Sequence, residues 1–376
     1  MSSANRGPSA ANGAGRRRTP AGAGRDSSTT AAPPAPVRPP IGARSSMREV
    51  AELAGVAMSS VSRVLSGHPD VSEKMRDRVM AAVDRLGYQP DLLAQSLRRR
   101  ATLSVGFVVG DIANPLLAEI VKGAETTLHE AGYSMLLANS ENDPTRDTDH
   151  VRLFEQRRVD GLLLSLASED NGEMAELLGA LETPSVLIDR ELPADAGASA
   201  VLSDHRTGMR AAVDHLLELG HRRIGLVLGQ PMRPSRERRR GLEEAYAARR
   251  LPATYTVVEG MLAPAHGRTA TRRLLDQDQP PTAIVAGGNQ LLIGALEELR
   301  ERGIRVGEEM ALVSCDAIPL TELLEPPIAV IRRDNREIGR QAALLMLRHM
   351  AGEETRERVL LPTEYLPRPS AAPPAA

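Results

Sequence analysis

Residues 50–67, VAELAGVAMSSVSRVLSG, place small hydroxyls and one long cation together on a short predicted helix. The apolar spacing buries Val61 and Val64. It leaves outside Met58, Ser59, Ser60, Ser62 and Arg63. Arginine can donate two hydrogen bonds to guanine, serine can meet donors or acceptors on base edges, and an apolar side chain can pack on a thymine methyl. This face suits DNA, although a plain three-helix domain with a solvated serine face would carry the same pattern.

The flanking sequence predicts the helices that would position this face. Ser46 and Glu49 match a capping box, in which each side chain bonds the other residue's amide. Gly55 ends that first helix, and a second helix spans about 58–66 after a short turn. Ser72 caps a third helix that runs to about residue 86. Two helices joined by a glycine-containing turn form a helix-turn-helix, whose second helix can enter a major groove.

Beyond residue 103 short apolar runs alternate with amphipathic helical patterns. Ten runs are strand-like, from SVGFVV at 104–109 to IAVIRR at 328–333. Strands spaced by helices predict parallel sheets covered by helices, and ten strands divide naturally into two doubly wound lobes. The predicted fold is therefore an α-helical headpiece followed by a two-lobed α/β core. Ligands of such sheets bind at the carboxyl ends of the strands, which between two lobes means in the cleft.

Charge and composition favour a nucleic-acid-binding protein and argue against a membrane or secreted protein. The first 100 residues hold 16 Lys and Arg against 8 Asp and Glu, and the remaining residues hold 31 against 41. A basic first part on an acidic body favours a polyanionic partner for the first part. No apolar run reaches the roughly 20 residues that span a bilayer, and the N-terminus lacks the apolar core of a signal peptide. With a single cysteine, Cys315, the chain fits a reducing cytoplasm.

The run from Ser46 to Arg100 resembles the DNA-binding headpiece of the LacI family of bacterial transcription regulators. The matching text is REVAELAGVAMSSVSRVLSG and VSEKMRDRVMAAVDRLGYQPDLLAQSLRR, and SVGFVVGDIANPLLAEIVKGAE and SDHRTGMRAAVDHLLELGHRRIGLVLG continue the match through the body. The resemblance implies a periplasmic-binding-protein-like effector domain. It also implies a sequence-specific repressor that binds a palindromic operator as a homodimer, under control of a small-molecule effector in the interlobe cleft.

Five segments follow from the patterns and the resemblance together. Residues 1–45 are predicted to be a disordered basic tail, 46–89 a helix-turn-helix domain, 90–100 a hinge helix or linker, 101–368 the two-lobed effector-binding and dimerisation domain, and 369–376 a disordered tail. In the hinge, the resemblance gives Leu97 the place of a minor-groove wedge and puts Arg98 near phosphates. A solvated basic linker is the alternative.

The resemblance also implies a set of effector-binding residues. They are Asp111, Asn114, Asp189, Arg238, Asn289, Asp316 and Arg333. Each could instead be a surface or crossover charge. The family's usual Asn-Asp pair is here Gly288-Asn289, so the match is imperfect. The chain has no Trp and only two Phe, which puts a stacked sugar or purine in doubt, whereas arginines favour an anionic metabolite. The effector is thus expected to be sugar-like or anionic.

Two other function classes are weaker. The sequence has no GxGxxG, Walker, HExxH or GxSxG motif, so no catalytic residue, cofactor or metal site is expected. His221 is interpreted as structural, near a helix C-terminus. A solute-binding protein would need a secretory signal and would not need the headpiece. The favoured hypothesis is a cytoplasmic, nucleoid-associated regulator.

Overall fold

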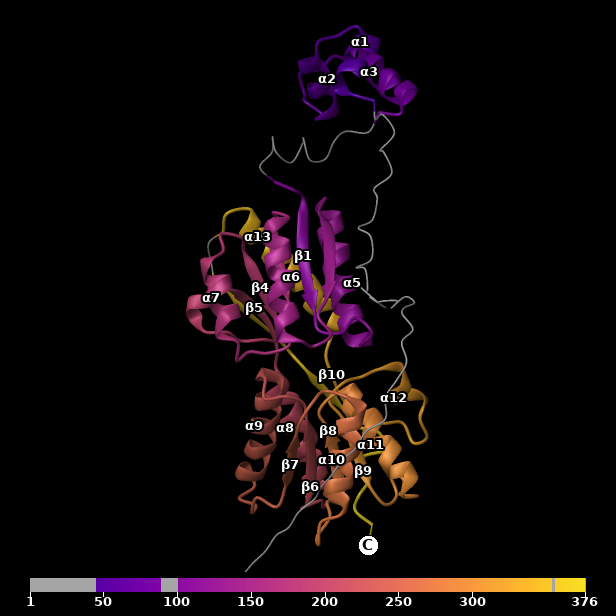
Figure 1. Ribbon diagram of the computed structural model, residues 1–376. Coiled ribbons are helices and arrows are strands. Elements are labelled where there is room, and N and C mark those ends of the chain that lie inside the picture. Colours follow the sequence, from indigo (N-terminus) through magenta and orange to yellow (C-terminus); the bar gives the residue numbers. More distant parts are fainter. Residues whose placement is uncertain (1–44, 89–100, 354–355, 376) are drawn as a thin grey trace, which may run out of the picture. The chain divides into compact units, whose positions relative to one another are not determined.

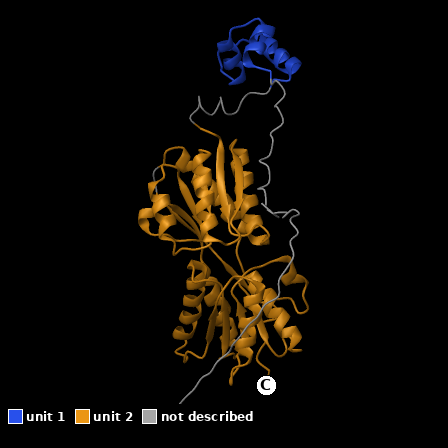
Figure 2. Ribbon diagram, viewed as in Figure 1, with its two compact units in different colours: residues 1–90 blue, residues 91–376 orange. Residues whose placement is uncertain are grey.

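The computed structural model describes residues 45–88, 101–353 and 356–375 (Figure 1). The chain divides into two compact units, Met1–Pro90 and Asp91–Ala376 (Figure 2). The predicted basic tail, apart from Ser45, and the predicted hinge segment, including Leu97 and Arg98, lie outside the described residues.

The first unit contains the three predicted helices, α1 (Met47–Ala54), α2 (Met58–Leu65) and α3 (Glu73–Leu86). The predicted capping box is present, because the Ser46 hydroxyl accepts the Glu49 amide at 3.2 Å and the Glu49 carboxylate accepts the Ser46 amide at 2.6 Å. Ser72 occupies the N-cap position of α3, but its side chain makes no capping hydrogen bond. The core of this unit is built from small and apolar side chains, namely Val50, Ala51, Ala54, Val61, Val64, Val79, Ala82 and Tyr88.

The second unit begins with a six-stranded sheet in the order β11-β5-β4-β3-β1-β2, with every pair parallel. Its strands are β1 (Ser104–Val109), β2 (Ser134–Asn139), β3 (Gly161–Leu164), β4 (Ser185–Ile188), β5 (Ser199–Ser203) and β11 (Arg358–Leu361). The elements around it are α5 (Pro115–Glu130), α6 (Pro144–Gln156), α7 (Gly172–Ala180), the 3₁₀ turn Ala194–Ala196 and α13 (Asn335–Met350). These elements form the N-lobe.

A second six-stranded sheet, in the order β12-β10-β9-β8-β6-β7, forms the C-lobe. Its strands are β6 (Ile224–Leu228), β7 (Thr256–Glu259), β8 (Ala283–Ala286), β9 (Ala311–Ser314), β10 (Ala329–Arg332) and β12 (Glu364–Leu366). The helices are α8 (His205–Glu218), α9 (Arg233–Ala248), α10 (Pro264–Leu275), α11 (Asn289–Glu301) and α12 (Pro319–Leu323). Only β12, among the described strands, runs antiparallel to its neighbour.

Each sheet is buried on both faces, which explains why its central strands are nearly continuous apolar runs. In the N-lobe one core packs β-strand side chains against α5 and α13, and another packs them against α6 and α7. In the C-lobe one core lies under α8 and α9 around Tyr246, and the other lies under α10 and α11. The predicted fold class, a helical headpiece with two doubly wound lobes, is confirmed.

The chain crosses between the lobes three times. The crossings are residue 204 between β5 and α8, residues 333–334 between β10 and α13, and residues 362–363 between β11 and β12. The last crossing was missed from the sequence, because β11 and β12 are short edge strands of four and three residues without a continuous apolar run. The chain passes from one lobe to the other at each of these crossings, so a side chain there can contact both lobes.

The prediction of a disordered tail at 369–376 is wrong for the described part, residues 369–375. Ser370 is fully buried, and its hydroxyl donates to the Leu312 carbonyl at 2.6 Å and accepts the Ala329 amide at 2.8 Å. The Ala372 carbonyl bonds His221 at 2.8 Å. The segment is ordered by hydrogen bonds to the C-lobe, which its Pro- and Ala-rich composition does not reveal. None of the helices in the described ranges is both long and apolar enough to cross a membrane.

Candidate functional site

The outer face of α2 carries five of the seven residues that the sequence assigned to DNA, all except Leu97 and Arg98. Met58, Ser59 and Arg63 are exposed, Met58 by 53%, whereas Ser60 and Ser62 are half-buried. Val61 and Val64 fix the opposite side of the helix in the core. Because Ala57 precedes α2 and offers no side-chain cap, the first amides of the helix stay open to an outside acceptor such as a phosphate.

The described headpiece is not itself basic. Residues 45–88 hold six Lys and Arg and six Asp and Glu. Its described ion pairs are Arg48–Glu52 and His68–Asp70, and Arg63 forms none within the described chain. The positive excess of the first hundred residues therefore comes from the segments on either side of this helical domain, and within the domain Arg63 is a cation without a carboxylate partner.

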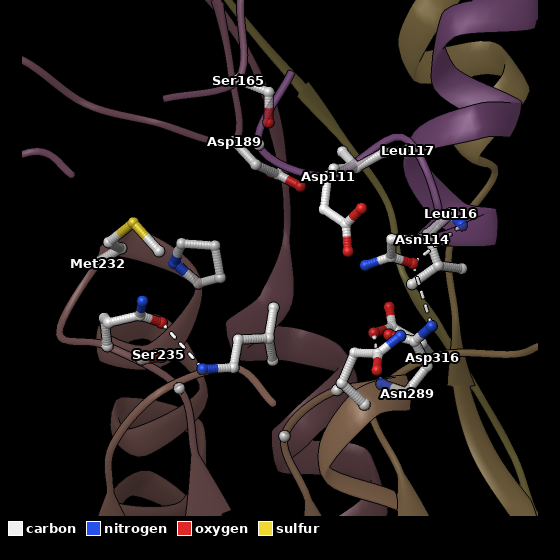
Figure 3. A pocket seen from close by; sticks show the side chains of 18 of the residues that line it. Asp111, Asn114, Leu116, Leu117, Ser165, Asp189, Met232, Ser235, Asn289 and Asp316 are labelled. Atoms are coloured by element: carbon white, nitrogen blue, oxygen red, sulfur yellow. Dashed lines mark hydrogen bonds between the residues drawn. The ribbon is translucent and has the colours of Figure 1, made fainter. Parts of the chain in front are cut away.

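A cavity of about 100 Å³ lies between the two lobes of the second unit. Polar side chains converge on it from the ends of β-strands and the starts of helices, as expected for a doubly wound fold. Figure 3 shows Asp111 and Asn114 of the N-lobe near Asn289 and Asp316 of the C-lobe. All seven predicted effector residues line this cavity: Asp111, Asn114, Asp189, Arg238, Asn289, Asp316 and Arg333.

Arg333, at the second crossing, connects the lobes electrostatically. Its guanidinium pairs with Asp189, which follows β4 of the N-lobe, and with Asp316, which follows β9 of the C-lobe, at 3.4 Å. Burial raises the pKa of Asp189, but His205, Arg333 and hydrogen bonds from Ser203 lower it by more, so this pKa lies well below its usual value. Asp189 is thus held as a carboxylate, and one cation serves two buried anions.

A direct polar contact also closes the cleft. Asn114 is the N-cap of α5, and its Oδ1 accepts the Leu116 amide at 3.1 Å. The same oxygen accepts a hydrogen bond from Nδ2 of Asn289, the first residue of α11, at 3.0 Å (Figure 3). Two helix starts, one from each lobe, therefore meet at the cavity.

Glu169 forms a further interlobe contact that the sequence did not reveal. Its carboxylate accepts the Arg233 amide at 2.9 Å, at the uncapped start of α9, and the Arg236 guanidinium at 2.6 Å. A carboxylate at a helix N-terminus is favoured by the helix dipole. Glu169 lies in a polar loop, and nothing in its neighbourhood distinguishes it from a solvated acid before the lobes are placed together.

His205 is the second cleft residue that was missed. It begins α8 directly after the first crossing, and its side chain is 2% exposed. Burial, followed by the charge of Arg238, lowers its pKa to about 4, so the ring is neutral at pH 7. Nε2 lies 3.5 Å from Asp189 Oδ2 and has no hydrogen-bond partner in the described chain. Its place next to a strand end, in the run LSDHR, is the signal that could have found it.

Several other cleft atoms lack hydrogen-bond partners in the described chain. Asn289 Oδ1 is buried without a hydrogen bond to any described residue, and Asp316 Oδ1 has only its 3.4 Å ion pair with Arg333. Buried polar atoms are nearly always satisfied by protein, water or a ligand. The cleft therefore combines preformed ion pairs with open donors and acceptors, an arrangement that can bind a polar small molecule. The described residues contain no cluster of His, Cys, Asp and Glu that could hold a metal ion.

Comparison with known proteins identifies the family. Residues 46–91 match the family model described as bacterial regulatory proteins, lacI family, and residues 213–371 match a periplasmic binding protein-like domain. The HTH-type transcriptional repressor PurR of Haemophilus influenzae (strain PittEE) is 32% identical over 312 residues, which cover 82% of this chain and 92% of that protein. The chain belongs to the LacI family. It is a DNA-binding transcriptional repressor with a helix-turn-helix domain and a ligand-binding domain.

Solved structures agree with this assignment. The lac repressor dimer bound to operator and the anti-inducer ONPF superposes with a TM-score of 0.79 at 25% identity, covering 88% of this chain and 99% of that chain. A complex of the transcriptional regulator CelR with cellobiose gives a TM-score of 0.65 at 31% identity, covering 87% of this chain and 100% of that chain. The predicted resemblance to the LacI family is confirmed, in the headpiece and in the two-lobed domain alike.

Proposed function

We propose that this LacI-family repressor binds a palindromic operator as a homodimer and that a small molecule in the interlobe cleft changes its operator affinity. One observation carries the DNA-binding half of this proposal. The exposed face of α2 holds Arg63 in the last turn of the helix, a cation without a carboxylate partner among the described residues, and the helix begins at Met58 without a side-chain cap. Such a face suits base edges and phosphates together.

Each residue of the face has its own proposed role. Arg63 donates two hydrogen bonds to guanine O6 and N7, Ser59 meets a neighbouring base edge, and Met58 packs on a thymine methyl. Ser60 and Ser62 contact phosphates and fix the register. Outside the described residues, Leu97 is proposed to wedge into the minor groove at the operator centre, with Arg98 on the backbone.

The cleft supports the effector half of the proposal. The seven predicted effector residues that line it come from both lobes, so a ligand bound among them would stabilise one interlobe arrangement over another. The three lobe crossings are where such a rearrangement would be transmitted. If the ligand and the operator favour different lobe arrangements, ligand binding lowers operator affinity. If they favour the same arrangement, ligand binding raises it.

A homodimer is proposed from the surface of the N-lobe. Strand β2 is an edge strand that pairs only with β1 among the described strands, and it exposes Leu136 by 36% and Leu137 by 43%. Exposed apolar side chains on an unpaired edge mark a contact surface. Two copies joined there would present two α2 helices to the two half-sites of a palindrome. Such a regulator acts in the cytoplasm, at the nucleoid.

A mobility-shift assay tests this function. Duplex DNA from the region upstream of the protein's own gene is titrated with the full chain and with a chain that begins at Ser45, at low and physiological salt. The proposal predicts that both proteins bind one palindromic fragment far more tightly than an unrelated duplex of equal length, with affinity falling as salt rises. Equal binding of every duplex by the chain from Ser45 would contradict it.

A further inference from the structure

Three arginines line the cleft, of which Arg190 and Arg333 are half-buried and Arg238 is buried, and they differ in their partners. Arg333 pairs with Asp189 and Asp316. Arg238, on α9, is 7% exposed and donates to the Gly287 carbonyl at 2.8 Å, yet it forms no ion pair with any residue in the described ranges. A buried cation without a counter-charge is costly. Arg238 is therefore the position in the cleft where an anionic ligand would gain most.

His205 completes this side of the cavity. The charge of Arg238 acts on the ring, and the ring nitrogen Nε2 is buried without a hydrogen-bond partner among the described residues. A neutral imidazole offers one donor and one acceptor, depending on its tautomer. Arg238 and His205 together present a charge and a hydrogen-bonding group to one bound anion, whereas the acids Asp189 and Asp316 are already paired with Arg333.

The shape of the cavity limits what the anion can be. No Phe, Tyr or Trp of the described ranges lines it, and the two phenylalanines, Phe107 and Phe154, are buried in the N-lobe cores. Flat sugar faces and purine rings are commonly held by stacking on such side chains. The volume is about 100 Å³, and an apolar cavity of about 150 Å³ holds one benzene molecule. The occupant of this cavity is therefore expected to be small and held by polar contacts.

We propose that the effector is a small hydroxy acid, with its carboxylate between Arg238 and His205 and its hydroxyls on the opposite wall. There, Asn289 Oδ1 is a buried acceptor without a hydrogen-bond partner among the described residues, and a hydroxyl can donate to it. A neutral polyol of the same length could make the same hydrogen bonds on that wall, but it would leave the charge of Arg238 without a counter-charge. This inference rests on the proposed function, in which a cleft ligand controls operator binding.

Matched pairs of acid and polyol test the ligand class. The thermal stability of the full chain and the Kd from calorimetry are measured with glycerate against glycerol and with gluconate against sorbitol, at equal concentrations. At least one acid should raise Tm and bind more tightly than its polyol. Arg238→Gln should weaken binding of that acid about 10- to 100-fold, the range of a hydrogen bond to a charged group. Arg238→Lys, which keeps the charge, should lose less.

A control variant lies on the same helix. Arg239 pairs with Glu259 at 2.7 Å and does not line the cavity, so Arg239→Gln should bind the acid like the unmodified protein. The proposal is overturned if neither acid exceeds its polyol, or if the acid binds Arg238→Gln and the unmodified protein equally. If the acid binds as expected but operator affinity does not change, the ligand class stands and effector control fails. If only a neutral sugar alters operator binding, effector control stands and the ligand class is wrong.

Discussion

The α2 face and the interlobe cleft are both recognition surfaces, but they hold their charges in opposite ways. On α2, Arg63 is exposed and has no ion-pair partner within the described chain, and the helix around it depends on none of its interactions. In the cleft, Arg333 is only 13% exposed and pairs with two carboxylates from different lobes. Residues of the α2 face can therefore bind a partner without contributing to the stability of the fold, whereas residues of the cleft contribute to both.

This difference has a physical origin. A surface that meets a polyanion can leave its cation in water until the partner arrives, at almost no cost to folding. Buried charges in a cleft are mostly paired in advance, as Arg333 is with Asp189 and Asp316, because an uncompensated buried ion costs several kcal/mol. Arg238, which has no such partner among the described residues, is the exception. Substitutions should consequently change DNA affinity alone on α2, and folding as well as ligand binding in the cleft.

The largest effect is expected from Arg333→Met. Removing this cation leaves Asp189 and Asp316 buried without their shared partner, and breaking a buried pair in this way costs about 3–5 kcal/mol. Urea denaturation of the second unit within the full chain measures the loss. The neighbouring Arg332, whose partner Glu364 is 60% exposed, provides the matched control, and Arg332→Met should cost less than about 1 kcal/mol. Equal losses in the two variants would show that burial at Arg333 does not matter.

His205 predicts a dependence of stability on pH. Its pKa is about 4 in the folded protein against 6.5 in the unfolded chain, so between these values only the unfolded chain binds the proton. The free energy of unfolding therefore falls as pH drops from 6.5 toward 4, by up to about 3 kcal/mol from this group. His205→Asn should remove this contribution of His205 to the pH dependence. The urea midpoints at pH 7 and pH 5 should then lie closer together than in the unmodified protein. An unchanged separation would contradict the buried neutral ring.

On α2, Arg63→Ala should leave the free energy of unfolding within about 0.5 kcal/mol, because the side chain is exposed and forms no ion pair in the described structure. The same change should remove about 1–3 kcal/mol of discrimination between the operator and a duplex altered at one base pair. Fluorescence anisotropy with the two duplexes measures the discrimination, and urea denaturation measures the stability. If Arg63→Ala lowered the free energy of unfolding but left the discrimination between the two duplexes intact, Arg63 would stabilise the fold and would not read DNA.

The smallest effect on specificity is expected from deleting residues 1–44. These residues hold seven arginines and one aspartate, whereas the described headpiece is neutral. The deletion should flatten the dependence of log affinity on log salt, by about 0.9 for each phosphate that the tail neutralises, and leave the ratio of operator to non-operator affinity nearly unchanged. Anisotropy titrations over a salt series measure both quantities. If the tail instead recognised the DNA sequence, its deletion would lower the ratio of operator to non-operator affinity.

Local periodicity made most of the fold predictable. The ten apolar runs and three headpiece helices emerge from spacing alone, because each element's own burial dictates its pattern. Strands β11 and β12 and the segment at 369–375 escaped notice, since their partners, such as Leu312 for Ser370, lie far away in the sequence. Their own residues carry little apolar pattern, so only the assembled sheets show that they are ordered.

The cleft was predictable only in part. The resemblance to the LacI family brought seven residues to one cavity, including Asp189 and Arg333 from different strand ends. It did not indicate that Arg333 is already neutralised while Arg238 is not, because pairing depends on distances across the lobes. Glu169 and His205 were missed for the same reason. Their local sequence matches that of an exposed acid and an ordinary helix start.

The most direct test of the account is a parallel selection from a random duplex library with the full chain and with Arg63→Ala. The account predicts that the unmodified protein enriches a palindrome containing a guanine at one fixed position in each half-site. It also predicts that Arg63→Ala enriches the same palindrome without that guanine preference. Enrichment of an identical motif by both proteins, with the guanine retained, would contradict the assignment of the α2 face to DNA.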